Sequence, residues 1–316
     1  MDSRQQRRHK LRNAVQTTLL LTGMAALLAT CAWLIAGWEG VLWTVVGGAV
    51  AVAITPKVTP RMVLAMYRAR PITPATAPEL YQALDWIADR AGLPAVPRLF
   101  YIPSSMLNAF AVGKPDGAAV AVTDGLLRTL SLREIVAVLA HEISHVRNHD
   151  LWVMGLADII TRLTRVMAFA GLLLLAISLP VWLVERGTVP VLLIIILLAA
   201  PTFGSLLQMA LSRAREYDAD LDAAGLTGDP AGLASALRKM ERVQGRFWEM
   251  LMPDQRIPDP SLLRTHPPTE ERIDRLLSLY AEPDRPRRDS GDGFRVPLTL
   301  PAVDRKPRRH ANGLWY

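Results

Sequence analysis

Four long uncharged runs divide the chain. Residues 13–38 contain 26 uncharged positions in succession, more than the roughly 20 apolar residues that cross a hydrocarbon core. Three further runs follow at residues 40–56, 166–184 and 187–212, with 17, 19 and 26 positions. A chain of 316 residues has too little remaining protein to bury four such helices in a soluble core. The pattern therefore predicts four transmembrane helices in two hairpins, the first helix covering residues 14–36.

The charge distribution predicts the orientation of these spans. The chain has a net charge of +7 and a pI near 9.9. Basic side chains gather on both flanks of the first pair of spans, at Arg4, Arg7, Arg8, Lys10, Arg12, Lys57, Arg61, Arg68 and Arg70. The two short connectors carry only Glu39, and Glu185 with Arg186. By the positive-inside rule, both termini and the soluble segments face the cytoplasm, in a multi-pass protein of the inner or plasma membrane. This topology explains the basic pI without a nucleic-acid partner.

The soluble segments have the pattern of a small α+β domain. Residues 79–91 have helical apolar spacing, whereas residues 98–102, 107–112 and 118–122 are typical of short strands. From about residue 281 the chain is rich in Pro, Asp, Arg and Gly, which indicates a disordered basic tail. The predicted fold class is thus a mainly α membrane protein with four transmembrane helices and a cytoplasmic α+β domain.

Five segments follow from this pattern. They are a basic segment and first hairpin (1–56), the first part of the soluble domain (57–165), the second hairpin (166–212), the second part of the domain (213–280) and the tail (281–316).

The motif His-Glu-x-x-His is the strongest chemical signal in the sequence. Ser131 and Glu134 form a capping-box pattern ahead of a helical run that leads into His141, Glu142 and His145. Residues four apart share a helix face, so both imidazoles could bind one metal ion while Glu142 handles a water proton. The single cysteine, Cys31, lies in an uncharged run, so a metal must be held by His and carboxylate groups.

A third metal ligand is needed to complete such a site. The extended pattern His-Glu-x-x-His-x-x-Gly-x-x-His would need glycine at position 148 and a third histidine at position 151, but these residues are Asn148 and Leu151. Glu216 and Asp220, just after the last uncharged run, share a helix face. Glu216 could bind zinc while Asp220 accepts the N–H of a ligand imidazole. Alternatively, Glu216 and Asp220 form an ordinary acidic helix face, with Arg213 and Arg215 as ion-pair partners.

Four motifs in order resemble the HtpX-type membrane metalloproteases, bacterial relatives of the CAAX prenyl protease within the gluzincins. The motifs are LNAFA at residues 107–111, HEISH at 141–145, SRAREYDAD at 212–220 and THPPTEERI at 265–273. The resemblance implies His141, His145 and Glu216 as ligands of one zinc ion per chain. It also implies Glu142 as the catalytic base.

The resemblance further implies that Asn108, Ala109 and Phe110 form an edge strand that pairs with an extended substrate. A plain core strand, with Phe110 inward and Asn108 in a turn, is the alternative. His266 has three interpretations: a catalytic donor to the oxyanion, a reversible extra zinc ligand, or a helix cap. Arg213 is a candidate for steadying Glu216 or a substrate carbonyl, or for a simple salt bridge.

Together these features predict a zinc endopeptidase that cleaves misfolded or damaged membrane proteins at the cytoplasmic side of the lipid bilayer. Two alternatives stay open. One is a specific processing protease for lipidated or signal-derived peptides, and the other is a non-proteolytic, zinc-stabilised membrane chaperone. The sequence leaves the oligomeric state open.

Overall fold

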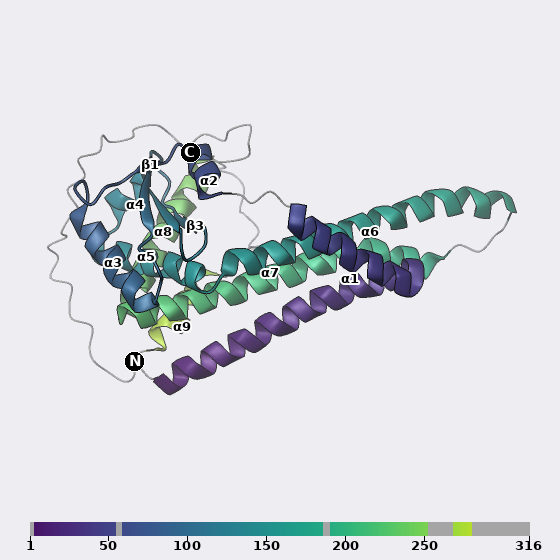
Figure 1. The fold of residues 1–316 in the computed structure, drawn as a ribbon, viewed down its shortest axis with the longest axis horizontal. Coiled ribbons are helices and arrows are strands. Elements are labelled where there is room, and N and C mark those ends of the chain that lie inside the picture. The colour runs from purple at the N-terminus through teal and green to yellow at the C-terminus, as the bar shows by residue number, and fades with distance from the viewer. Residues whose placement is uncertain (1–2, 55–58, 186–189, 252–267, 280–316) are drawn as a thin grey trace.

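Three long helices form one end of the molecule, and a mixed α/β part forms the other (Figure 1). The computed structural model describes residues 3–54, 59–185, 190–251 and 268–279. The long helices are α1 (Ser3–Ile54), α6 (Asp150–Glu185) and α7 (Val191–Thr227). Each contains a stretch long and apolar enough to cross a membrane. Among the described residues there are thus three candidate membrane helices.

Helix α1 combines the first two predicted spans. Its backbone leaves helical geometry at Ala36 and Gly37, and Gly37 has a positive φ of 58°. A glycine adopts this conformation at little steric cost, so two residues suffice to break the helix. Figure 1 shows the chain turning back at this break, with the last part of α1 lying across the α6–α7 pair. The runs at 14–36 and 40–56, the second as far as Ile54, therefore lie on two helical segments of α1 that meet at this break.

Apolar side chains hold the three helices together over much of their length. Met24 of α1, Ala157 of α6 and Leu211 of α7 are fully buried in one cluster. Cys31 is buried with Leu197 of α7 in a second cluster. Many other apolar side chains of these helices are exposed, including Trp38, Leu192 and Ile177. An apolar exterior of this kind suits a lipid environment.

The remaining elements build the α/β part. They are α2 (Pro60–Met66), β1 (Arg70–Pro71), α3 (Pro78–Ala91), β2 (Arg98–Ile102), β3 (Ala109–Val112), β4 (Ala119–Thr123), α4 (Asp124–Thr129), α5 (Leu132–Arg147), α8 (Pro230–Leu251) and α9 (Thr269–Leu277). The predicted helix at 79–91 and the three predicted strands are confirmed, with end positions that differ by two residues at most. The predicted tail at 281–316 lies outside the described residues.

The four strands form a mixed sheet in the order β1-β2-β4-β3. Strands β2 and β4 are parallel, whereas β1 and β3 are antiparallel to their neighbours. One face packs on a large apolar core that contains residues from both soluble segments, for example Leu84 of α3, Leu139 of α5 and Ile273 of α9. Helix α2 covers the other face through Leu64. Strand β3 is left at the edge of the sheet, next to α5.

Helix α5 begins as its sequence predicts. The Ser131 hydroxyl accepts the Glu134 N–H, and the Glu134 carboxylate accepts the Ser131 N–H, which makes a complete capping box. Lys239 and Ser235 of α8 also donate to Glu134. Burial would raise the pKa of Glu134, but these donors outweigh burial and lower it. The start of α5 is therefore fixed both locally and against α8.

Candidate metal centre

Helix α5 presents two imidazoles on one face. His141 and His145 lie one turn apart, and their Nε2 atoms are 3.2 Å from each other. The two rings are edge-to-face, with centroids 4.7 Å apart. Both Nε2 atoms therefore point at the same small volume, as two ligands of one metal ion would.

Helix α7 brings a carboxylate to the same point. Glu216 Oε2 lies 3.6 Å from His141 Nε2, and Glu216 Oε1 lies 3.8 Å from His145 Nε2. One ligand atom from each of the three residues lies within 4.8 Å of the others. Glu216 is buried because α7 packs against α5 at this point. Within the described part of the chain, the structure thus brings together three residues that could hold a metal ion.

The outer nitrogens of both imidazoles face carboxylates. His145 Nδ1 is 2.7 Å from Asp150 Oδ2, and His141 Nδ1 is 3.1 Å from Asp220 Oδ1. The His141 contact has ion-pair distance but not the alignment of a hydrogen bond. Carboxylates in these positions orient a ligand ring and make its metal-facing nitrogen more basic. Asp220 was predicted for this role from the sequence, whereas Asp150 was not.

A buried guanidinium neutralises part of the acidic cluster. Arg272 of α9 donates to both carboxylate oxygens of Asp220, at 2.6 and 2.7 Å, and its Nη1 lies 3.3 Å from Glu216 Oε2. The sequence suggested Arg213 as the residue that steadies Glu216. Arg213 is half-buried on α7, three residues before Glu216, and its role stays a prediction. The Arg272 guanidinium is one cation that the structure places on Glu216.

The charges around the site favour a bound cation. Burial lowers the pKa of His141, but Asp220 and Glu216 outweigh burial and raise it to about 10. Burial would lower the pKa of Arg272 as well, and the same two carboxylates raise it. The carboxylates of Asp220 and Glu216 thus favour the protonated, positively charged forms of His141 and Arg272, and they would favour a metal cation for the same reason.

Glu142 lies beside the ligands and faces the edge of the sheet. Its Oε2 accepts the backbone N–H of Ala111 in β3 at 3.0 Å. Burial is the main cause that raises the pKa of this carboxyl group above its usual value. A carboxylate with a raised pKa is a better proton acceptor near neutral pH.

The residues suggested for substrate binding are Asn108, Ala109 and Phe110, and their backbone groups point toward two opposite edges of strand β3. The Asn108 C=O accepts the N–H of Thr123, which directs the backbone groups of Asn108 and Phe110 at β4. The backbone groups of Ala109 and Ala111 then point away from β4, toward Glu142. The side chain of Phe110 packs against Tyr67 on the other face of the sheet. His266 lies outside the described residues.

Sequence reasoning gave no role at the metal site to three polar residues that surround it: Asp150, Arg215 and Arg272. Arg215 donates to Asp150 at 2.5 Å and to Asp218 at 3.0 Å, although Asp150 is 65 positions away in sequence. Arg272 lies within the motif at residues 265–273, and this position could have marked it as a residue of the site. Asp150 follows the metal-binding helix directly, which was the signal for that residue.

Comparison with known proteins agrees with this geometry. The model of the family described as "Peptidase family M48" matches residues 74–280. A protease HtpX homolog of Desulforapulum autotrophicum is 35% identical over 309 residues, which cover 90% of this chain and 93% of that protein. A protease HtpX homolog of Acaryochloris marina is 36% identical over 290 residues, which cover 86% of this chain and 97% of that protein.

Among solved structures, the crystal structure of S. mikatae Ste24p is similar, with a TM-score of 0.47 and 20% identity. The match covers 85% of this chain and 66% of that one. The family match spans more than half of the chain, and the two homologues match it over most of their length. The chain therefore belongs to peptidase family M48 and is a membrane metallopeptidase of the HtpX type.

Proposed function

We propose that this metallopeptidase uses zinc to hydrolyse peptide bonds of misfolded or damaged membrane proteins at the cytoplasmic surface of the inner membrane. In this proposal His141, His145 and Glu216 bind the metal and Glu142 is the general base. The observation that carries the proposal is the position of Glu216 on α7, the same helix that provides a candidate membrane span.

The ligand atoms fit a zinc ion. Two ligands about 2.05 Å from a tetrahedral zinc are about 3.3 Å from each other. The observed separations of 3.2, 3.6 and 3.8 Å are close to this value. Two imidazoles and one carboxylate are also a common donor set for catalytic zinc, because they leave the fourth position free for water or substrate. Zinc is therefore the metal that we assign to the site.

Glu142 performs the proton transfers. A bound zinc would supply Lewis acidity, polarising the scissile carbonyl and lowering the pKa of a water molecule. The Ala111 N–H holds Oε2 of Glu142, so its other oxygen is the proton acceptor from the attacking water. The same carboxyl group then gives this proton to the leaving amine nitrogen. No nucleophilic Ser or Cys is needed.

Strand β3 would orient the substrate. The backbone groups of Ala109 and the Ala111 C=O point away from β4, so an extended peptide can add to this edge by main-chain hydrogen bonds, while the Ala111 N–H holds Glu142. Such bonds do not depend on the substrate side chains, which suits an enzyme for many damaged proteins. Asn108 and Phe110 maintain the strand through their pairing with β4.

Backbone methylation of a substrate tests this binding mode. An N-methyl group on the peptide nitrogen that pairs with Ala109 should lower kcat/KM about tenfold, because one main-chain hydrogen bond is lost. A scan of single N-methyl groups along one cleaved peptide measures the effect. Alternate positions should be sensitive, and the positions between them serve as matched controls. A flat scan would exclude pairing with β3.

The membrane position of the site determines the substrate class. Glu216 is three residues past Arg213, where the uncharged run of α7 ends, which is about 4.5 Å along the helix. Basic residues at both flanks of α1 support a cytoplasmic position of the α/β part. The break and reversal in α1 support two crossings by this helix and four spans in total.

The apolar core supports a single protease domain. It joins residues of the segments 57–165 and 213–280, which the hairpin at 166–212 separates in sequence. We propose these boundaries for the two halves of the domain, with the first hairpin in residues 1–56.

A comparison of substrates tests the proposed function. Purified, zinc-loaded protein in detergent should cleave an unfolded membrane protein at least tenfold faster than a stably folded soluble protein. The physical reason is that only an unfolded segment can present an extended strand to β3. Product bands over time give the rates. Equal rates would exclude quality control of membrane proteins, and cleavage of a single lipidated or signal-derived peptide would favour specific processing.

A further inference from the structure

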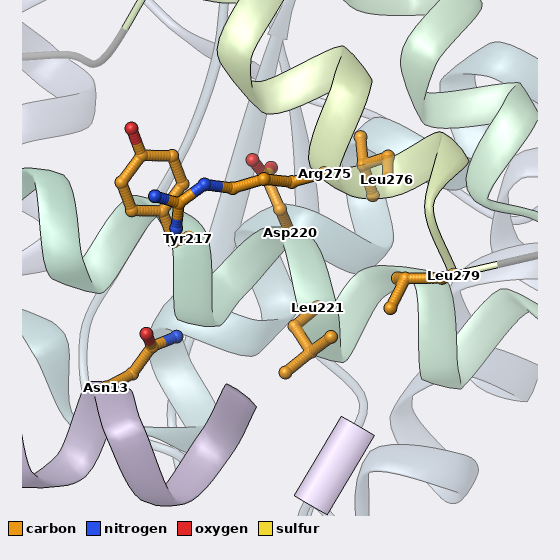
Figure 2. Close-up of a pocket in the computed structure, with 7 residues that line it drawn as sticks. All are labelled: Asn13, Tyr217, Asp220, Leu221, Arg275, Leu276 and Leu279. Carbon is orange, nitrogen blue, oxygen red and sulfur yellow. The ribbon is translucent and has the colours of Figure 1, made fainter. Parts of the chain in front are cut away.

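The cytoplasmic end of α1 is attached to the metal centre by polar side chains. Asn13 is only 3% exposed, although Leu11 two residues before it is 69% exposed. Figure 2 shows Asn13 on α1 at one side of a pocket whose other walls are α7, with Tyr217, Asp220 and Leu221, and α9. A buried amide at this position needs a partner, because an unsatisfied polar group is costly.

The partner of Asn13 begins a chain of contacts that ends on a metal ligand. Asn13 Nδ2 donates to Asp218 at 3.3 Å, and Asp218 accepts from Arg215 at 3.0 Å. The other side of Arg215 donates to Asp150, whose second oxygen is 2.7 Å from His145 Nδ1. Asp218, Arg215 and Asp150 are all buried. Buried polar networks of this kind restrict their members to one arrangement.

A second branch starts one turn earlier on α1. Lys10 Nζ is 2.6 Å from Asp222 Oδ1, and Asn148 donates to the other oxygen of Asp222 at 2.9 Å. Asp222 is 3% exposed at its side chain, so this ion pair has a buried acceptor. Asn148 is the residue that caps the end of α5. The two branches therefore both run from α1 through α7 to the end of the metal-binding helix.

The two branches end on either side of one unusual residue. Asn148 and Asp150 flank His149, which has a φ of 56°. The left-handed conformation is unfavourable for a residue with a side chain and persists where surrounding contacts hold it. It separates α5 from α6 and turns Asp150 back toward His145. The contacts at Asn148 and Asp150 are thus well placed to hold this junction.

We propose that Lys10 and Asn13 are positioning residues that hold the α5–α6 junction, and through it His145, in the geometry that binds the metal. The proposal rests on the metallopeptidase function and extends it to the N-terminal segment before the first span. A residue that contacts no substrate would then influence the reaction, because it fixes the carboxylate that orients a metal ligand. Changes in such outer partners commonly lower metal affinity or activity by 10- to 100-fold.

Asn13→Asp is the main test variant, because a carboxylate at this position cannot donate to Asp218 and would repel it, which disturbs the position of Asp218 against Arg215. We expect zinc affinity, measured by competition with a chelator, to fall about tenfold. We also expect kcat to fall with little change in KM, because strand β3 is untouched. In the cobalt-substituted protein, the visible absorption bands should shift. Amide hydrogen exchange of the metal-free protein should become faster at residues 146–152 while α3 keeps its protection.

The matched control is Arg12→Ala, an exposed basic residue between Lys10 and Asn13. It should behave as wild type in all four measurements. Lys10→Ala is a milder second variant for the case that Asn13→Asp does not fold, and Lys10→Arg should restore its properties. Unchanged zinc affinity, kcat and hydrogen exchange at the junction in the folded variants would overturn the positioning role of Lys10 and Asn13. The proposed metallopeptidase function would not be affected by that result. If the wild type showed no zinc-dependent cleavage, the proposed function would fail, and exchange in the metal-free variants would still decide whether α1 holds the junction.

Discussion

Replacing Glu142 by Gln is expected to lower kcat/KM for peptide cleavage about 1,000-fold, because the amide cannot accept a proton from water. The amide oxygen can still accept the Ala111 N–H, so the side chain should keep its place. Zinc content should stay at one ion per chain, since Glu142 is not among the three residues that form the candidate metal cluster. Cleavage of an unfolded membrane protein and elemental analysis of the same detergent-purified samples measure both effects.

The control for this experiment is Asp158→Asn, the same acid-to-amide change at a partly exposed residue of α6 that pairs with Arg162. It should retain full cleavage and full zinc content. Equal cleavage by wild type and Glu142→Gln would indicate a contaminating protease or another active site. Absence of zinc from the wild type would refute the metal assignment.

Replacing Arg272 by Met is expected to destabilise the metal-free protein by about 3 kcal/mol, because Asp220 and Glu216 would lose a buried guanidinium and keep only the His141 imidazolium as a shared cation. For a domain of this size, the unfolding temperature should fall by ~6–12 °C. Thermal unfolding in detergent after removal of metal measures the change without a contribution from lost zinc. Added zinc should recover part of the difference, because it supplies positive charge at Glu216.

Arg275→Met is the matched comparison on the same helix. Arg275 pairs with the exposed Glu271 and stacks on Tyr217, so its loss should cost about 1 kcal/mol. A loss as large as that of Arg272→Met would show that α9 is held by general packing. In that case Arg272 would have no special role at the metal centre.

The local parts of this molecule are those that the sequence predicts well. The capping box at Ser131 and the spacing of His141 and His145 depend on contacts within one helix, which repeat every 3.6 residues whatever surrounds them. The strand at Arg98–Ile102 was similarly predictable from alternation and its flanking turns. Glu216 was harder, because spacing alone could not separate a metal ligand from an ordinary acidic face.

The partners of the metal ligands were not predictable from spacing. If α5 continued as a helix, position 150 would lie about 140° around its axis from His145, too far to reach it. The left-handed His149 changes this direction, and no pattern in the sequence marks that residue as a break. Arg272 and Asn13 approach α7 from opposite ends of the chain, so only the tertiary packing brings them to Asp220 and Asp218. Buried polar pairs between distant segments leave no periodic signal.

The helix α7 runs without a described break from Val191 in the apolar bundle to Thr227 beyond Glu216. The helix of the two histidines, by contrast, is separated from α6 by the turn at His149. Hydrophobic mismatch makes a long helix tilt when the bilayer is thinner than its apolar length. A tilt of α7 would move one corner of the metal triad while the other two stay on α5. The thickness of the surrounding bilayer would thus influence both the activity of the enzyme and the distance from the membrane at which a substrate is cleaved.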